Sequence, residues 1–260
     1  MSSGNQYTCN LTQGLGLIDE TLSILELWEP GMGAVKLYEK VLSSGLFSTM
    51  TARRVKNIVV DVVRTRYLVD NGKPAMLIKA MAGRFNKRAV SQIMYVYTCQ
   101  VNRILFDFIT DVYWSAFAAC RDSVTGDMAL QFVRRAVAEG KTTCRWSDSV
   151  IRRNAAYLIG ACSDFGLLEK SRKTEKKICS LIIDADAALI IAHELHFSGL
   201  GDNAIVSNEI WSLFGLDRSD VIDTLKRISV RGALIVQQAG EVLSIGWKYK
   251  NMEELVNGIA

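Results

Sequence analysis

The chain has 260 residues and 49% of them are hydrophobic, which is too apolar a composition for a disordered protein. Its 31 Lys and Arg residues against 27 Asp and Glu leave a net charge of +4, which permits a nucleic-acid or membrane-surface partner without requiring one. Only 2 prolines occur in the whole chain, so long helices with short connections are expected.

Apolar residues recur at helical spacing through most of the first half of the chain. The helices predicted there are Leu15–Trp28, Ala34–Leu42, Ala52–Val69 and two or more between Ala75 and Ala119. Asn71-Gly72 is a typical turn, and Pro74 suits the first position of the helix that follows. Gly83 and the polar run Asn86–Arg88 mark a joint between later helices.

The second half contains a similar order of elements twice. Helices at Asp127–Glu139 and Ser147–Phe165 precede a predicted hairpin, in which Leu167-Leu168 faces Ile178–Ile183 across a charged loop. The C-terminal part has the order helix, extended piece, helix, helix, hairpin, which is that of a winged helix. Its predicted elements are Asp184–Phe197, the extended Asn203–Val206, Ser207–Phe214, Ser219–Val230, the hairpin Ala233–Gln237 with Val242–Trp247, and a short helix at Met252–Val256.

These elements predict a mainly α fold, a multi-helix bundle with winged-helix-like modules and small β-hairpin wings. We expect three domains. Residues 1–125 form an N-terminal helical domain with a basic, helix-turn-helix-like segment, residues 126–184 a winged-helix-like unit, and residues 185–260 a C-terminal winged-helix domain.

The chain is predicted to be cytoplasmic. Its six cysteines are widely spaced and no pair forms C-x-x-C, which fits a reduced compartment. The first ten residues are polar and uncharged, unlike a secretory signal. The most apolar stretch, Ile93–Cys120, carries Arg103, Asp107 and Asp111, so no membrane-spanning helix is predicted.

No catalytic pattern is present in the sequence. His193 and His196 could share a helix face and ligate a metal, but no third ligand is evident and a structural role is favoured. Gly14–Gly16 lacks the remaining residues of a phosphate loop. Asp184 and Asp186 fit a helix N-terminus better than a catalytic pair. We therefore predict no catalytic residue, no metal ligand, no cofactor and no enzymatic activity.

Basic charge is concentrated in one segment. Thr51–Val90 holds ten Lys and Arg residues against only Asp61 and Asp70, a net charge of +8, so the rest of the chain is net acidic. On a helix, Val55, Val59 and Val62 would face the core while the basic residues face outward. The outward residues predicted to meet DNA are Arg53, Arg54, Lys56, Asn57 and Arg64. A solvated basic face is the alternative.

A second basic surface is predicted on the helix that ends at Phe165. Val150, Leu158, Cys162 and Phe165 would face inward there, whereas the residues facing outward would be Arg152, Arg153, Ala156, Gly160 and Ser163. The loop that follows is rich in lysine and would form a basic wing. The nucleic-acid-binding residues predicted here are Arg152, Arg153, Lys170, Arg172, Lys173, Lys176 and Lys177, and a solvated hairpin is the alternative.

Several motifs of the chain resemble those of one known family. They are the segment Tyr7–Thr21, the run Thr51–Arg54 ahead of a long helix, and Asn154–Ile159 leading into Gly166-Leu167-Leu168. In these it is similar to the BrxA family of bacteriophage-exclusion (BREX) systems. The resemblance implies a small, non-enzymatic component encoded beside a DNA methyltransferase and an ATPase, with a helical fold like that of an RNA antitermination factor and a nucleic-acid-binding role.

The leading hypothesis is a BREX component that binds double-stranded DNA mostly through phosphates, with other BREX proteins as further partners and no membrane partner. A protein–protein adaptor in the same complex is the second hypothesis, because Asp220 and Asp223 share the predicted Ser219–Val230 helix with Lys226 and Arg227. A transcription regulator, which would need dimers and a defined operator, ranks third.

Overall fold

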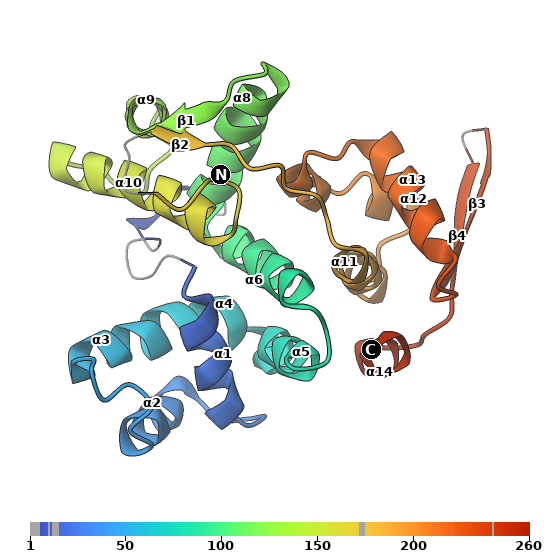
Figure 1. Cartoon of the computed structure of the whole chain (residues 1–260), viewed down its shortest axis with the longest axis horizontal. Helices are drawn as coiled ribbons and strands as arrows, with labels where there is room; N and C mark the ends of the chain where they lie inside the picture. Colours follow the sequence, from blue (N-terminus) through green and yellow to red (C-terminus); the bar gives the residue numbers. More distant parts are fainter. Residues whose placement is uncertain (1–5, 10, 12–15, 172–174, 241) are drawn as a thin grey trace. The chain divides into compact units, whose positions relative to one another are not determined.

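The fold comes from a computed structural model that describes residues 6–9, 11, 16–171, 175–240 and 242–260. Helices dominate, and the strands form two small antiparallel sheets of two strands each, so the predicted mainly α class with small hairpins is confirmed (Figure 1). Within these residues, no helix is both long and apolar enough to span a bilayer.

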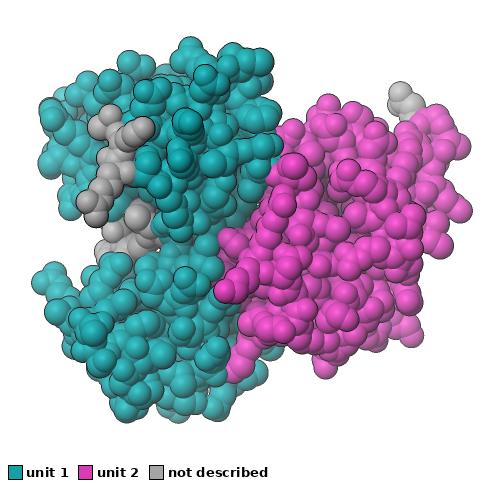
Figure 2. Space-filling model, in the orientation of Figure 1, with its two compact units in different colours: residues 1–76, 95–181 teal, residues 77–94, 182–260 magenta. Residues whose placement is uncertain are grey.

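Contacts divide the chain into two compact units, coloured separately in Figure 2. Unit 1 comprises residues 1–76 and 95–181, and unit 2 comprises residues 77–94 and 182–260. Two helices, α5 (Lys73–Met81) and α6 (Lys87–Val101), begin in one unit and end in the other. The division into three domains along the sequence stays a prediction.

The first part of unit 1 is a helical cluster. It contains α1 (Ile18–Leu27), α2 (Ala34–Ser43), α3 (Ala52–Lys56), the π-helical η3 (Asn57–Val63), α4 (Arg64–Tyr67) and the 3₁₀ turn η4 (Asp70–Gly72). Helices α3, η3 and α4 follow one another without a break, so the predicted long helix is present with a widened centre. Its buried valines and Ile58 pack toward α1 and α2.

The second part of unit 1 combines helices with short strands. Its elements are α7 (Arg103–Phe108), the π-helical η5 (Ile109–Tyr113), α8 (Trp114–Ala118), β1 (Ser123–Thr125), α9 (Gly126–Ala138), α10 (Asp148–Asp164) and β2 (Glu175–Lys177). Helix α9 packs against α10, and β1 lies against α9. The predicted pairing of Leu168 with Ile178 exists, but β2 also pairs with β1, a strand that the sequence did not predict.

Unit 2 contains α11 (Ala185–Phe197), α12 (Asp202–Val206), the 3₁₀ helix η6 (Glu209–Phe214), α13 (Arg218–Ser229), β3 (Leu234–Ala239), β4 (Val242–Trp247) and α14 (Met252–Ile259). Asp184 caps α11, as predicted, and Asp217 forms a capping box with Asp220 at α13. The expectation of an extended Asn203–Val206 was wrong. That segment is helical because Ile205 and Val206 are buried on one side, against neighbouring elements.

The two histidines belong to an aromatic cluster in unit 2. His193 is buried, its Nδ1 lies 2.8 Å from the Leu189 carbonyl oxygen, and its ring meets Trp247 edge-on. His196 stacks on the same Trp247 with ring centroids 4.4 Å apart. Among the residues that the structure describes, no three His, Cys, Asp or Glu side chains gather as a metal site. The contacts of both histidines with Trp247 therefore fit the structural role that the sequence favoured.

His193 is expected to make unit 2 less stable in mild acid. Burial, opposed by the Leu189 and Ala233 carbonyls and aided by His196, lowers its pKa below the ordinary 6.5. Below pH 6.5 the unfolded chain takes up a proton that the folded chain resists, so the free energy of unfolding falls until the folded pKa is reached. Urea unfolding at about pH 7.5 and 5.5 measures this loss. His193→Phe should reduce it, and a loss unchanged by His193→Phe but removed by His196→Phe would contradict the assignment.

Candidate nucleic-acid interface

The helix that starts at Thr51 separates charge from core as the sequence predicted. Arg53, Arg54, Lys56 and Arg64 are exposed and Asn57 is half-buried, whereas the valines behind them are buried. The Thr51 hydroxyl accepts a hydrogen bond from the Arg54 amide at 3.2 Å and starts the helix. We call Arg53, Arg54, Lys56 and Arg64 the α3 surface.

The π-helical centre η3 changes how this surface is presented. An α-helical spacing of 100° per residue does not apply between Asn57 and Val63, because the turn there is wider. Arg64 lies beyond it, and its Nε donates to the Val60 carbonyl oxygen at 2.9 Å. Arg64 is therefore less free to reach outward than Arg53 or Lys56.

The segment Thr51–Val90 carries a net charge of +8, and much of the charge that lies outside the α3 surface does not belong to any one surface. Arg66 is buried, with 2% of its surface exposed. Lys73 pairs with Asp70 at 2.9 Å, Arg84 donates to Asn257 at 2.9 Å, and Arg88 donates to the Ile182 carbonyl. The segment is also divided between the two units at Met76. The concentration of charge along the sequence therefore overstates the concentration in space.

Helix α10 presents Arg152, Arg153 and Ala156 to solvent, as predicted. Gly160 is half-buried. Ser163, predicted outside, is buried and donates to the Ile159 carbonyl oxygen at 3.1 Å. The outward face is thus confined to the first half of the helix. The C-terminal turn is buried on more sides than it would be in a helix with one buried face and one exposed face.

The turn before α10 adds a residue that the sequence reading missed. Arg145 is exposed and lies two residues before Ser147, the N-cap of α10. Buried Trp146 and Thr142 anchor the turn. The sequence could have indicated Arg145 as a candidate, because it lies just before the residue predicted to cap the helix. We call Arg145, Arg152 and Arg153 the α10 surface.

Tyr7, which lies near the N-terminus of the chain, holds the start of this turn in place. It bridges Thr142 in parallel fashion, and its hydroxyl donates to Asp107 Oδ2 at 2.6 Å. Burial and the Asp107 carboxylate raise the pKa of Tyr7 above its usual range, so the hydroxyl keeps its proton and remains a donor. Asp107 also pairs with Arg103 at 2.7 Å. The turn that carries Arg145 is thereby fastened to α7.

The predicted basic wing is only partly described. Lys170 and Lys177 are exposed, while Lys176 is half-buried and its Nζ donates to the Ser171 carbonyl. Arg172 and Lys173 lie outside the described residues. Glu175 accepts a hydrogen bond from Ser123, so the acid in this strand is turned toward β1.

The α3 and α10 surfaces have different packing neighbours within unit 1. Helix α3 contacts α2 and η3, whereas α10 packs on α9. Lys170 follows the C-terminal end of α10, and Arg153 lies eleven residues before that end, a separation of about 16 Å along the axis. Arg145, Arg152 and Arg153 therefore belong to the N-terminal end of α10 and the turn before it, whereas Lys170 lies beyond the other end of the helix.

Comparisons with known proteins give one family and one structural likeness. A family model described as BrxA matches residues 5–194. No curated protein matches the chain. Among solved structures, the crystal structure of an uncharacterized protein from Magnetospirillum magneticum is similar, with a TM-score of 0.58, 14% identity, and coverage of 80% of this chain and 98% of that chain. At that identity the likeness concerns the fold alone.

Proposed function

Because the chain belongs to the BrxA family, and that family implies a component of a BREX phage-defence system, we propose that it acts there by binding double-stranded DNA, largely through phosphates. BrxA is not a known enzyme family, and the proposed role needs no catalysis. Membership also suggests other BREX proteins as partners.

The order of elements in the second part of unit 1 supports this proposal. A long helical stretch, β1, α9, α10, the Leu168 bridge, a loop and β2 follow one another as helix, strand, helix, helix and wing do in a winged-helix module. In helix-turn-helix proteins the second helix of the pair enters the major groove, with its N-terminal residues nearest the bases. Helix α10 is the second helix of the corresponding pair in this chain.

The observation that carries the proposal is the charge at this end of α10. Arg145, Arg152 and Arg153 are all exposed, and no ion pair involves any of them among residues 6–9, 11, 16–171, 175–240 and 242–260. Guanidinium groups without a protein partner suit phosphate oxygens, which they contact in bidentate fashion. Lys170 and Lys177 would add contacts further along the duplex, and the α3 surface would add a second contact region.

We also infer that residues 185–260 form a winged-helix-like module that serves protein contact. Helices α11, η6 and α13 precede the β3–β4 hairpin in that order. On α13, the exposed Asp223 lies one turn from Lys226 and Arg227, so a duplex would meet repulsion as well as attraction. This mixed charge favours an adaptor role for unit 2 alongside DNA binding by unit 1.

Salt titration of a short labelled duplex tests the proposed function. Anisotropy should show binding to arbitrary sequences, and log affinity should fall linearly with log salt concentration, with a slope of about −0.9 for each phosphate neutralised. Three to five contacts are expected from the α10 surface and the two lysines, a slope of about −2.7 to −4.5. Binding that is insensitive to salt, or no binding at about 50 mM salt, would reject a phosphate-based role.

A further inference from the structure

Two cysteines far apart in the sequence are brought together by the pairing of their backbone segments. The Thr143 amide donates to the Tyr7 carbonyl oxygen at 3.1 Å, and Tyr7 lies beside Thr142 in a parallel bridge. Cys9 and Cys144 each follow that bridge by two residues, in the same chain direction. Paired backbones lie about 5 Å apart, which is within the Cα separation that a disulfide allows.

The side chain of Cys9 is held against α10. It is half-buried, and its Sγ accepts a hydrogen bond from Asn154 Nδ2 at 3.9 Å. Asn154 is itself buried and also donates to the Val150 carbonyl oxygen at 2.9 Å, so its position on the helix is fixed. The Cys9 sulfur therefore lies beside the helix whose preceding turn contains Cys144.

Cys144 combines a fixed backbone with an accessible thiol. The Thr142 hydroxyl donates to the Cys144 carbonyl oxygen at 2.8 Å, and Trp146 is buried two residues later. The Cys144 residue is nevertheless exposed. An oxidant in solution can therefore reach this sulfur, while the turn around it stays in place.

The electrostatics of Cys9 give a second sign that the two thiols are close. Burial raises the pKa of Cys9, the hydrogen bond from Asn154 opposes that rise, Cys144 adds to it and Arg153 opposes it. A thiol affects the ionisation of another thiol only over a short distance, because water and salt screen the interaction. The Cys144 contribution therefore agrees with the backbone pairing.

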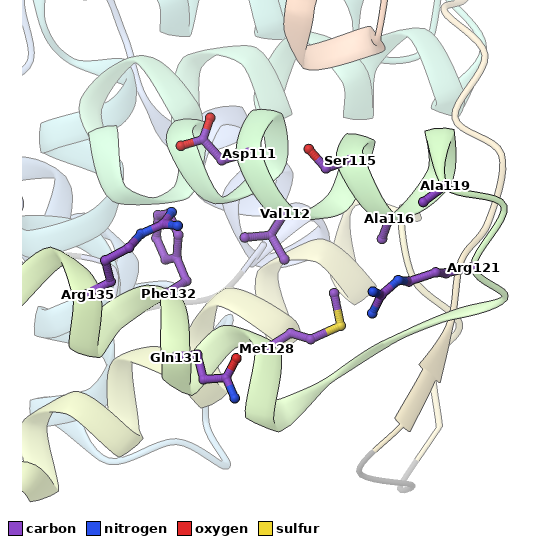
Figure 3. Close-up of a pocket in the computed structure, with 10 residues that line it drawn as sticks. All are labelled: Asp111, Val112, Ser115, Ala116, Ala119, Arg121, Met128, Gln131, Phe132 and Arg135. Atoms are coloured by element: carbon purple, nitrogen blue, oxygen red, sulfur yellow. The ribbon is translucent and has the colours of Figure 1, made fainter.

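The other cysteines differ from this pair in access or position. Cys99 and Cys162 are buried, and burial raises the pKa of both, so they stay protonated and out of reach of a soluble oxidant. Cys179 is half-buried. Cys120 is exposed and precedes Arg121, which lines the groove between α8 and α9 in Figure 3. Cys120 thus resembles Cys144, which is also exposed and followed by an arginine.

We propose that Cys9 and Cys144 form a redox-reactive pair that hydrogen peroxide converts to an intramolecular disulfide. The Cys144 thiolate attacks one peroxide oxygen, the O–O bond breaks, and a sulfenic acid forms as hydroxide leaves. The Cys9 thiolate then attacks that sulfur, the S–S bond forms, and a second hydroxide leaves. Overall, two thiols and one peroxide give one disulfide and two waters, and the two electrons pass from the sulfurs to the peroxide.

The disulfide would fasten the turn before α10 by a covalent bond. Tyr7 already holds this turn through its bridge and its hydrogen bond to Asp107. The cysteines are 135 residues apart, so a bond between them would also restrict a large part of the unfolded chain. Disulfides of this reversible kind are the ones found in reducing compartments. The inference does not rest on DNA binding.

Mass spectrometry of the full-length protein tests the pair. Dilute protein treated with hydrogen peroxide should lose about 2 Da, and peptide mapping should join Cys9 to Cys144. Cys9→Ser and Cys144→Ser should each abolish the link, whereas the matched control Cys120→Ser should retain it. Dimedone, which traps sulfenic acids, should label Cys144 in Cys9→Ser at least tenfold more than it labels Cys9 in Cys144→Ser.

Urea unfolding tests whether the bond fits the fold. Oxidation should raise the unfolding midpoint of the wild-type protein by about 1 M and leave that of Cys9→Ser unchanged. An unchanged or lower wild-type midpoint would mean that the bond distorts the structure and that the cysteines are not placed to form it.

The mapping has clear outcomes that would overturn the proposal. They are free thiols at Cys9 and Cys144 after oxidation, a link that involves Cys120 or Cys179 instead, or a link only between two copies of the chain. None of these readouts uses DNA. A failure of duplex binding would leave the thiol pair standing, and a missing disulfide would leave the proposed DNA-binding function standing.

Discussion

Gly72→Ala is expected to destabilise unit 1 by about 3 kcal/mol, the sum of a left-handed backbone cost and an overpacked contact. Gly72 has φ +78°, where an alanine is strained. A Cβ there would lie 2.7 Å from Trp28 Cζ2 and 2.8 Å from Cη2. The ring cannot easily move away, because Trp28 is buried and its Nε1 donates to the Met32 carbonyl oxygen at 2.9 Å.

Gly45→Ala is the matched control for this substitution. Gly45 also belongs to unit 1 and has φ +70°, but nothing lies within 4 Å of its added Cβ. It should cost about 1 kcal/mol, so the difference in urea unfolding free energy isolates the contact with Trp28. Trp28→Phe in the Gly72→Ala background should recover part of the loss. Equal costs for the two alanines would mean that the Trp28 ring yields.

The Gly72 turn shows what sequence patterns contain and what they omit. Asn71-Gly72 followed by Pro74 predicts a turn and a helix start, and the structure has η4 followed by α5. The pattern cannot predict Trp28 against the glycine, because that contact joins residues more than forty positions apart. Local chemistry predicts where the chain bends, whereas packing between distant segments decides which bends tolerate no substitution.

The same distinction explains the errors in secondary structure. Helices with several turns of apolar periodicity, such as α10, were predicted within a residue or two of their ends. The three-residue strand β1 was missed, since it shows no periodicity and its partner β2 is about fifty residues away. The five-residue α12 was read as extended for the same reason: an element of one turn takes its conformation from its neighbours.

Charge counts predicted the candidate surfaces only in part. Arg152 and Arg153 are exposed as expected, but Arg66 is buried and Arg88 is bound to a carbonyl. A net charge per segment does not distinguish a solvated guanidinium from one that satisfies a buried or structural acceptor. Arg145 shows the opposite error, since an isolated arginine in a short turn contributes little to any count yet lies beside α10.

Arg152→Glu/Arg153→Glu is expected to weaken duplex binding about 100-fold at low salt and to flatten the salt slope by about two units. Both side chains are exposed on α10, so their reversal should leave the fold intact while placing repulsion where phosphates would lie. Anisotropy across salt measures the affinity and the slope. Lys36→Glu on α2, also exposed and in unit 1, is a control that changes the net charge by −2, half the change in the double variant, and it should change affinity only slightly.

The companion variant Arg53→Glu/Lys56→Glu tests which surface the duplex uses. The α3 and α10 surfaces have different packing neighbours, so a duplex centred on α10 should lose less when the α3 surface is reversed. A larger loss from the α3 variant would place the duplex on the N-terminal helical cluster instead. Equal losses would require one duplex to contact both surfaces, and no loss from either would remove both from the interface. The salt slope separates these cases, because each lost phosphate contact lowers it by about one unit regardless of sequence.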